Sequence, residues 1–242
     1  MNFKKYIFVV YILCNSLSLY SQQVEIIKDS VCIDGVWREL QELTFTHPQI
    51  YCAIQQEDYN DFDTIFTDYK ERLNYKKKLI LDCNGSWKCL REKDYVLEYY
   101  EINYQKNGIL NATLCVENFV NTFIGIELFT FDLKEGKNLR EEVFINKDKL
   151  LEIYREKIEE DYDDVKKDND AYDDDDDFFS YGEDIDPVHL SQYEIETDSL
   201  GKIVTFRFFH PFHWNMRLFA EFSFEEIKPF LKPEFLRRLT DE

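Results

Sequence analysis

The segment from Tyr95 to Phe119, YVLEYYEINYQKNGILNATLCVENF, decides the fold class. Its centre is Asn107-Gly108, a dipeptide that supplies the two positive-φ positions of a tight hairpin turn. The run YVLEYYEINY precedes this turn and the run ILNATLCVENF follows it. Counting outward from the turn pairs Ile102 with Thr113 and Tyr100 with Cys115. The segment therefore predicts an antiparallel β-hairpin.

Strands and a helix are expected on both sides of this hairpin. Residues 42–50, ELTFTHPQI, alternate in polarity like a half-buried strand, which Pro48 ends because proline cannot donate to a ladder. Residues 122–131, TFIGIELFTF, predict another strand, and Gly136 is the pivot of the turn that follows it. Asp58 to Tyr75 predicts a helix. Its apolar stripe has three- and four-residue spacing and consists of Phe62, Ile65, Phe66, Tyr69 and Leu73.

The second half of the chain repeats the mixture of helix and hairpin. A helix is predicted from Asn146, a favourable N-cap. Its apolar face consists of Leu150, Leu151, Tyr154 and Ile158. Tyr193 to Phe209 predicts a late hairpin around a turn at Asp198 to Gly201, and Arg217 to Phe222 predicts the next strand.

The last residues predict a helical C-terminus. Ser223 and Glu226 form a capping box, and Pro233 suits the first turn of a further short helix. Antiparallel hairpins with two main helices and a helical end define an α+β fold, not alternating α/β units. We expect residues 22–242 to form a single domain, with division into subdomains 22–120 and 121–242 as the alternative.

The N-terminus predicts a secreted or periplasmic protein. Lys4 and Lys5 precede the apolar run from Ile7 to Leu13, and Ser21 marks a cleavage position, so residues 1–21 read as a signal peptide. The run is too short to span a bilayer, and no later segment is long and apolar enough to do so, so we do not expect an integral membrane protein.

Cysteine placement agrees with an oxidising compartment. Cys83 and Cys89 bracket NGSWK, a short turn-like segment, which makes this pair the first candidate disulfide. The alternative is that the cysteines are small buried apolar residues.

Charge is strongly unbalanced, with 49 acidic and 29 basic side chains and a formal net charge of −20. Residues 159–186 contain fifteen Asp or Glu and two Lys, which we interpret as a mobile acidic loop. A chain of this charge repels nucleic acid and anionic membranes at long range. Its electrostatic partners are therefore cations and basic proteins. The core of the acidic loop, and our candidate partner-binding set, is Asp173, Asp174, Asp175, Asp176 and Asp177.

These aspartates are also candidates for a calcium site. EF-hand loops alternate acidic ligands around an obligatory glycine, and here Phe178 occupies the glycine position. The run is not an EF-hand, and weak divalent-cation binding is the hypothesis that remains for it. We predict no metal site and no cofactor.

The stretch FRFFHPFHWNMR, residues 206–217, is the other candidate. His210 and His213 flank Pro211, and Trp214 follows them. Two histidines alone do not make a zinc site, which needs three or four ligands. We expect the histidines and Trp214 to shape or line the rim of a turn and to contribute to partner binding.

Catalytic motifs of the familiar kinds are missing from the sequence. It contains no G-x-S-x-G, no H-E-x-x-H and no phosphate-binding glycine loop, and it has seven glycines in all. We name no catalytic residue and favour a protein that is not an enzyme. A cell-envelope glycan or peptidoglycan hydrolase is the alternative; it predicts a carboxylate in a cleft beside His210, His213 or Trp214.

Four motifs in fixed order carry a family resemblance. They are FTHPQIY (45–51), YEINYQKNGILNATL (100–114), LFTFDLKEGKNL (128–139) and FSFEEIKPFLKP (222–233). Together they resemble the extracytoplasmic domain of RsiV-type anti-sigma factors and the non-catalytic N-terminal domain of PdaC-type peptidoglycan deacetylases.

The resemblance implies an α+β envelope domain that binds a partner, with lysozyme as the best-known ligand of the RsiV-type sensors. The chain departs from the family pattern at His47, where a tyrosine is usual, and at Asn111, near the usual serine. It also lacks a sigma-binding segment, a transmembrane helix and a deacetylase domain. We therefore expect a non-enzymatic domain that binds a basic protein such as a lysozyme, or a peptidoglycan fragment, and carry over no ligand residues.

Overall fold

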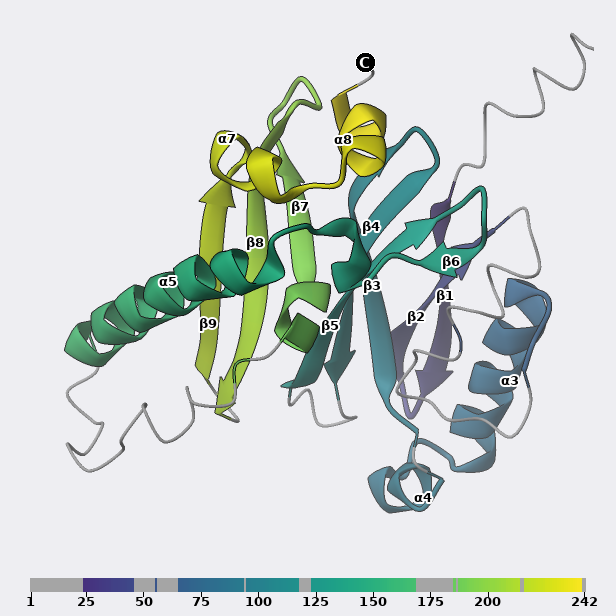
Figure 1. Cartoon of the computed structure of the whole chain (residues 1–242). Coiled ribbons are helices and arrows are strands. Elements are labelled where there is room, and N and C mark those ends of the chain that lie inside the picture. The colour runs from purple at the N-terminus through teal and green to yellow at the C-terminus, as the bar shows by residue number, and fades with distance from the viewer. Residues whose placement is uncertain are drawn as a thin grey trace, which may run out of the picture.

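The described part of the computed structural model has three antiparallel sheets and five α-helices, which confirms the α+β prediction (Figure 1). The structure describes residues 24–45, 55, 65–93, 95–117, 123–168, 185, 187–213 and 216–240 of the 242-residue chain. The expected signal peptide therefore lies outside the described residues, as do residues 46–54 and most of the acidic run.

The sheets follow one another along the chain. The first pairs β1 (Glu25–Ile33) with β2 (Val36–Thr44). The second has the order β3 (Leu97–Lys106), β4 (Ile109–Glu117), β5 (Phe123–Asp132) and β6 (Lys137–Asn138). The third has the order β7 (Tyr193–Thr197), β8 (Ile203–His213) and β9 (Met216–Ser223).

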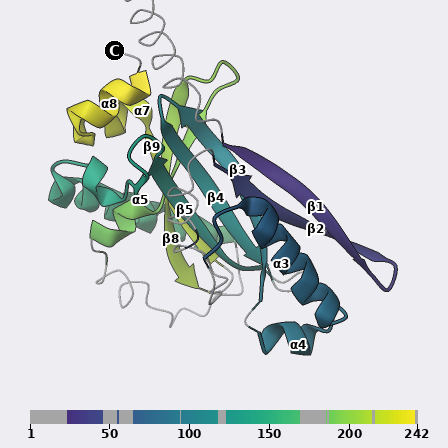
Figure 2. The ribbon, with the colours of Figure 1, turned by 90° about the vertical axis from the view of Figure 1, so that its right-hand side faces the viewer.

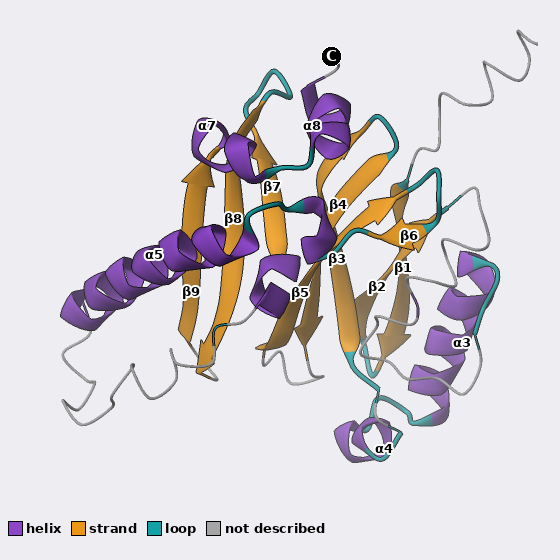
Figure 3. Cartoon of the chain, in the orientation of Figure 1, coloured by secondary structure: helices purple, strands orange, loops and turns teal. Residues whose placement is uncertain are grey.

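The helices lie between and after these sheets (Figure 3). The α-helices are α3 (Tyr69–Asp82), α4 (Trp87–Arg91), α5 (Lys147–Asp168), α7 (Phe224–Ile227) and α8 (Pro233–Thr240). Short 3-10 turns occur at η1 (Glu141–Val143), η2 (Pro187–Ser191) and η3 (Lys228–Phe230). Ser223 and Glu226 form the capping box predicted for α7.

The β3–β4 hairpin is confirmed, but its register is corrected by one residue. Asn107 and Gly108 take φ values of 53° and 76°, as the turn requires. Ile102 pairs with Ala112 and not with the expected Thr113, because the register shifts between Ile102 and Tyr104. The extra residue is Asn103, a β-bulge.

Three apolar clusters form the core of the part of the chain that the structure describes. One lies between the β1–β2 hairpin and the β3–β6 sheet and includes Leu43, Leu114 and Phe131. A second lies beneath α3, which runs along the β1–β2 hairpin (Figure 2). The third and largest lies between α5 and the β7–β8–β9 sheet. Of the predicted α5 stripe, Leu150, Tyr154 and Ile158 have no exposed surface, and Leu151 is half-buried against the same cluster.

The predicted boundaries of the two main helices need correction. Residues 58–64 lie outside the described residues, but Ile65 to Asp68 are not helical, and the described helix begins at Tyr69 instead of Asp58. The Asp68 side chain accepts a hydrogen bond from the backbone N–H of Lys70 and so begins the helix. The second helix, α5, continues to Asp168, so residues 159–168 of the expected acidic loop are helical.

A buried asparagine joins the second and third sheets. The Asn111 side chain donates to the carbonyl of Tyr193 and accepts from the N–H of Ile195, both at 2.8 Å. It also donates to Thr130 Oγ1 at 2.8 Å. Asn111 has no exposed surface, so it provides the backbone of β7 with hydrogen bonds that a neighbouring strand would otherwise supply.

Candidate functional site

His210 does not lie at the rim of a turn, as the sequence predicted. It belongs to β8, is 4% exposed, and its Nδ1 lies 3.0 Å from the Tyr154 hydroxyl. The His189 ring lies 5.2 Å away, centroid to centroid. Burial and the neighbouring His189 lower the pKa of His210 to about 4. The imidazole is therefore a neutral part of the core.

Strand β8 continues through Pro211, where the sequence predicted a turn, because β7 does not extend far enough to pair with Pro211. Tyr193, the first residue of β7, pairs with Phe208, so no β7 residue lies beside Pro211 on that edge. Pro211 pairs with Arg217 on the other side. A proline is tolerated where its missing N–H faces no partner strand.

The other predicted partner-binding residues cannot be placed in a site. Trp214 and Asp173 to Asp177 lie outside the described residues, and His213 is described only as the last residue of β8. In the described part of the chain, no group of three or more His, Cys, Asp or Glu side chains could hold a metal ion. Because His210 is buried against Tyr154 and His189, the hydrolase alternative receives no support from it.

The Cys83–Cys89 disulfide is present in the structure. The two Cα atoms lie 5.5 Å apart, and the bond ties the C-terminal end of α3 to α4. Cys32 is a free exposed thiol, and Cys115 is half-buried.

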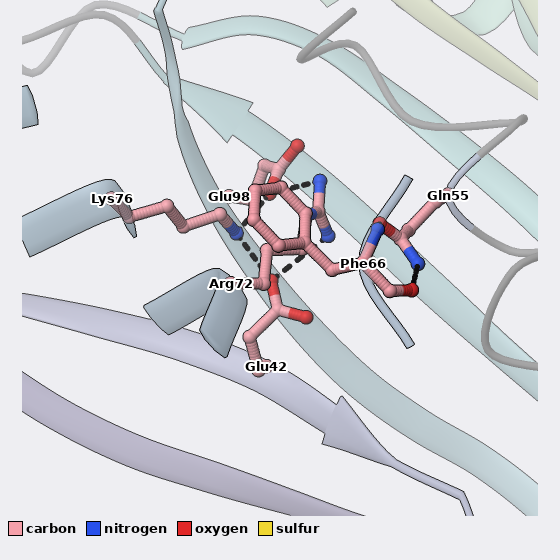
Figure 4. Close-up of polar contacts among 6 residues, drawn as sticks. All are labelled: Glu42, Gln55, Phe66, Arg72, Lys76 and Glu98. Carbon is pink, nitrogen blue, oxygen red and sulfur yellow. Dashed lines mark hydrogen bonds and ion pairs between the residues drawn. The ribbon is translucent and has the colours of Figure 1, made fainter. Parts of the chain in front are cut away.

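A buried group of four charged side chains was missed by the sequence interpretation (Figure 4). Glu42 of β2, Arg72 and Lys76 of α3, and Glu98 of β3 are each at most 4% exposed. We call these four residues the buried ion quartet. Arg72 Nη1 donates to Glu42 Oε1 at 2.9 Å, and Lys76 Nζ donates to both Glu42 Oε1 and Glu98 Oε2.

The quartet is electrically balanced and holds α3 against two sheets. Its two cations face its two carboxylates, so no net charge is buried. The pKa of the neighbouring Tyr95 is raised by its burial and by the negative charge of Glu98. Beside the quartet, Gln55 forms two hydrogen bonds with the backbone of Phe66, at 2.6 and 2.9 Å. Because the quartet is inaccessible to solvent, its role is structural.

Charged and aromatic side chains also gather on a partly exposed region, the face of the β7–β8–β9 sheet opposite α5. Successive strand residues point to opposite faces, and here Phe206, Phe208 and Phe222 point into the core. The face opposite carries the set that we call the acidic face. It consists of Glu194, Glu196, Arg207, Phe209, Phe219 and Glu221.

Arg207 is at the centre of the acidic face. Glu194, Arg207 and Glu221 stand in one row across the three strands. Arg207 Nη1 lies 2.7 Å from Glu196 Oε1, and its Nε donates to Glu221 Oε1 at 2.7 Å. Its guanidinium carbon also lies 5.4 Å from the Phe219 ring centroid.

The acidic face has more negative charge than its one arginine can balance. Burial raises the pKa of Glu194, Arg207 opposes that rise, and the surrounding carboxylates of Glu196, Glu101 and Glu221 add to it. Three glutamates around one arginine leave a local charge of −2, and the Glu221 side chain is 56% exposed. Such a surface can accept the cationic side chains of a partner, with Phe219 available for stacking.

Comparisons with known proteins leave the family open. No protein-family model matches the chain, and no curated protein is significantly similar to it. Among the described helices, none has the length and apolar character needed to cross a membrane.

Proposed function

We propose that this protein is a non-enzymatic binding domain of the secreted or periplasmic compartment and that its partner is a basic protein of the lysozyme type. The acidic face is the observation that carries the proposal. It combines excess negative charge on a partly exposed sheet surface with the half-buried ring of Phe219, which packs on the buried ring of Phe209 at a centroid distance of 5.8 Å.

The charge of the whole chain supports the same kind of partner. A net charge of −20 accelerates the encounter with a cationic protein, and this steering fades over a Debye length of about 8 Å at physiological salt. Contacts at the acidic face would then hold the partner in place. The Glu196–Arg207–Glu221 ion pairs keep these side chains in position before binding, which lowers the entropic cost of association.

Two further features support the compartment. The Cys83–Cys89 disulfide is typical of proteins that fold in an oxidising environment. The N-terminal apolar run and the ordered motifs that resemble those of RsiV-type and PdaC-type domains support the cell envelope as well. That resemblance also makes a peptidoglycan fragment the second ligand to test.

The proposal is tested by titrating lysozyme into the full chain by calorimetry at 50 and 150 mM salt. We expect binding at both concentrations, weaker at the higher one. The double variant Glu196→Gln/Glu221→Gln removes two charges from the acidic face and should weaken binding about five- to tenfold, because rim charges contribute up to about 1 kcal/mol each.

The matched control is Glu225→Gln/Glu234→Gln, which removes two exposed charges from α7 and α8. It should bind lysozyme as the unmodified chain does. Equal weakening by both pairs would mean that net charge alone governs the interaction. No binding at either salt concentration would refute lysozyme as the partner.

A further inference from the structure

The two helices of the N-terminal half carry the opposite charge from the rest of the chain. Residues 69–93, which span α3 and α4, contain eight Lys or Arg and three Asp or Glu, a net charge of +5 in a chain whose total is −20. Figures 1 and 2 show α3 and α4 on one side of the molecule and α5, which leads into the acidic run, on the other. The α3–α4 region therefore carries a local excess of positive charge.

Most of these cations are exposed and have no anionic partner among the described residues. We call this set the cationic surface: Lys70, Lys78, Lys88, Arg91 and Lys93. Within the described part of the chain none of the five forms an ion pair, although acidic residues greatly outnumber basic ones. By contrast, Arg72 and Lys76 belong to the buried ion quartet, and Lys77 pairs with Asp29 of β1.

The cationic surface is held on a rigid support. The Cys83–Cys89 disulfide ties α3 to α4, and the quartet fastens α3 to β2 and β3. Gly85 in the connecting turn has a φ of 64°, and a Cβ there would lie 2.7 Å from Ile33 Cγ2. The turn thus packs tightly on the β1–β2 hairpin, so the spacing between the lysines of α3 and α4 is set by the fold.

Apolar side chains stand among the cations. Leu81 is 55% exposed and Tyr75 is 41% exposed, and they lie three residues after and three residues before Lys78 on α3. Residues three apart are neighbours on a helix surface. Lysines beside an exposed leucine and tyrosine can bind a membrane interface, with the charges at the phosphates and the apolar side chains beneath them.

We propose that the α3–α4 cationic surface docks onto an anionic phospholipid bilayer and lies flat in its headgroup region. Four of the five cations are lysines, which bind a diffuse layer of phosphates as point charges and lack the bidentate geometry that arginine offers to one specific phosphate. Leu81 and Tyr75 favour a bilayer over a soluble polyanion, because only a bilayer offers apolar depth beneath the phosphates.

The overall negative charge of the chain does not oppose this docking at short range. Repulsion between an anionic bilayer and the acidic regions is screened beyond about 8 Å at physiological salt. Because α5, with its acidic side chains, lies on the other side of the molecule from α3 and α4, it does not bring negative charge to the contact that the cationic surface would make. The surface therefore predicts weak, reversible and salt-sensitive attachment.

The test measures cosedimentation of the full chain with vesicles of phosphatidylcholine alone and of phosphatidylcholine with about 30 mol % phosphatidylglycerol. We expect preferential binding to the anionic vesicles, weakened by added salt. Lys78→Gln/Lys88→Gln should reduce the partition coefficient on anionic vesicles about 25-fold, since each lysine near such a surface contributes about fivefold. Leu81→Ser should reduce it several-fold.

The control Lys149→Gln/Lys202→Gln changes net charge equally at two exposed positions outside the cationic surface and should leave partitioning within twofold. Equal loss in both lysine pairs, or equal binding of the unmodified chain to both vesicle types, would overturn the proposal. So would binding to soluble polyphosphate without binding to anionic vesicles. Because Lys78 and Lys88 lie outside the acidic face, their variant should still bind lysozyme, which separates this proposal from the preceding one.

Discussion

Replacement of Lys76 by methionine is the most direct test of how the N-terminal half is held together. Lys76 Nζ contacts the carboxylates of both Glu42 and Glu98, and the lysine side chain is 2% exposed. Methionine fills similar volume but carries no charge. The variant would leave two buried carboxylates facing the single guanidinium of Arg72.

The expected cost follows from the burial of these charges. Removal of one partner from a buried ion pair destabilises a protein by roughly 3–5 kcal/mol, because the remaining charge is neither solvated nor balanced. For a domain of this size, each kcal/mol lowers the melting temperature by about 2–4 °C. We therefore expect Lys76→Met to lower the melting temperature by roughly 6–20 °C, measured by circular dichroism with urea unfolding as a check on the free energy.

Two comparisons make this prediction specific. Lys78→Met, two residues further along α3 at an exposed position, should change the free energy of unfolding by no more than about 0.5 kcal/mol. Lys76→Met/Glu98→Gln restores one cation to one anion and should recover a large part of the loss. If Lys76→Met were no more costly than Lys78→Met, the quartet would not be the energetic link between α3 and the sheets.

Two further predictions concern the C-terminal half. The pKa of His210 lies near 4 in the folded protein, below the value of about 6.5 in an unfolded chain, so the free energy of unfolding should fall by up to about 3 kcal/mol as pH falls from about 6.5 towards 4. His210→Gln should flatten that part of the profile of urea midpoint against pH, and an unchanged slope would contradict the burial of a neutral His210. Asn111→Ala removes the side chain that bonds a buried carbonyl and N–H of β7, and it should lower the free energy of unfolding in urea by about 3–5 kcal/mol. The exposed Asn74→Ala should change it by about 0.5 kcal/mol or less, and similar values for the two variants would contradict a role for Asn111 in joining the sheets.

Local signals predicted the elements well where one short stretch contained all the necessary information. Asn107-Gly108 identified the β3–β4 turn, Ser223 and Glu226 identified the start of α7, and Asn146 identified the residue before α5. Each rests on contacts between residues that are close in the sequence. The pairing beyond the turn was wrong by one residue because the bulge at Asn103 depends on Asn111 and Thr113, to which its side chain donates.

The position of charge was harder to predict than its amount. Arg72 and Lys76 are four residues apart on α3, a spacing that places them on one face of a helix, but the sequence interpretation ended this helix at Tyr75. Even with the correct helix, nothing local indicates that this face meets Glu42 and Glu98, which lie 30 and 22 residues from their partners. Arg207 with Glu196 and Glu221 likewise becomes a cluster only through strand pairing.

The amino-acid sequence by itself determined the α+β class, the main hairpins and the excess of acidic charge, because composition, turn dipeptides and caps act over a few residues. Only the tertiary structure decided which charges are buried in the quartet, which form the acidic face and which remain as the cationic surface. It also placed His210 in the core instead of at a rim. The physical reason is that burial and ion pairing depend on distances between separate elements, and those distances exist only once the sheets and helices have packed.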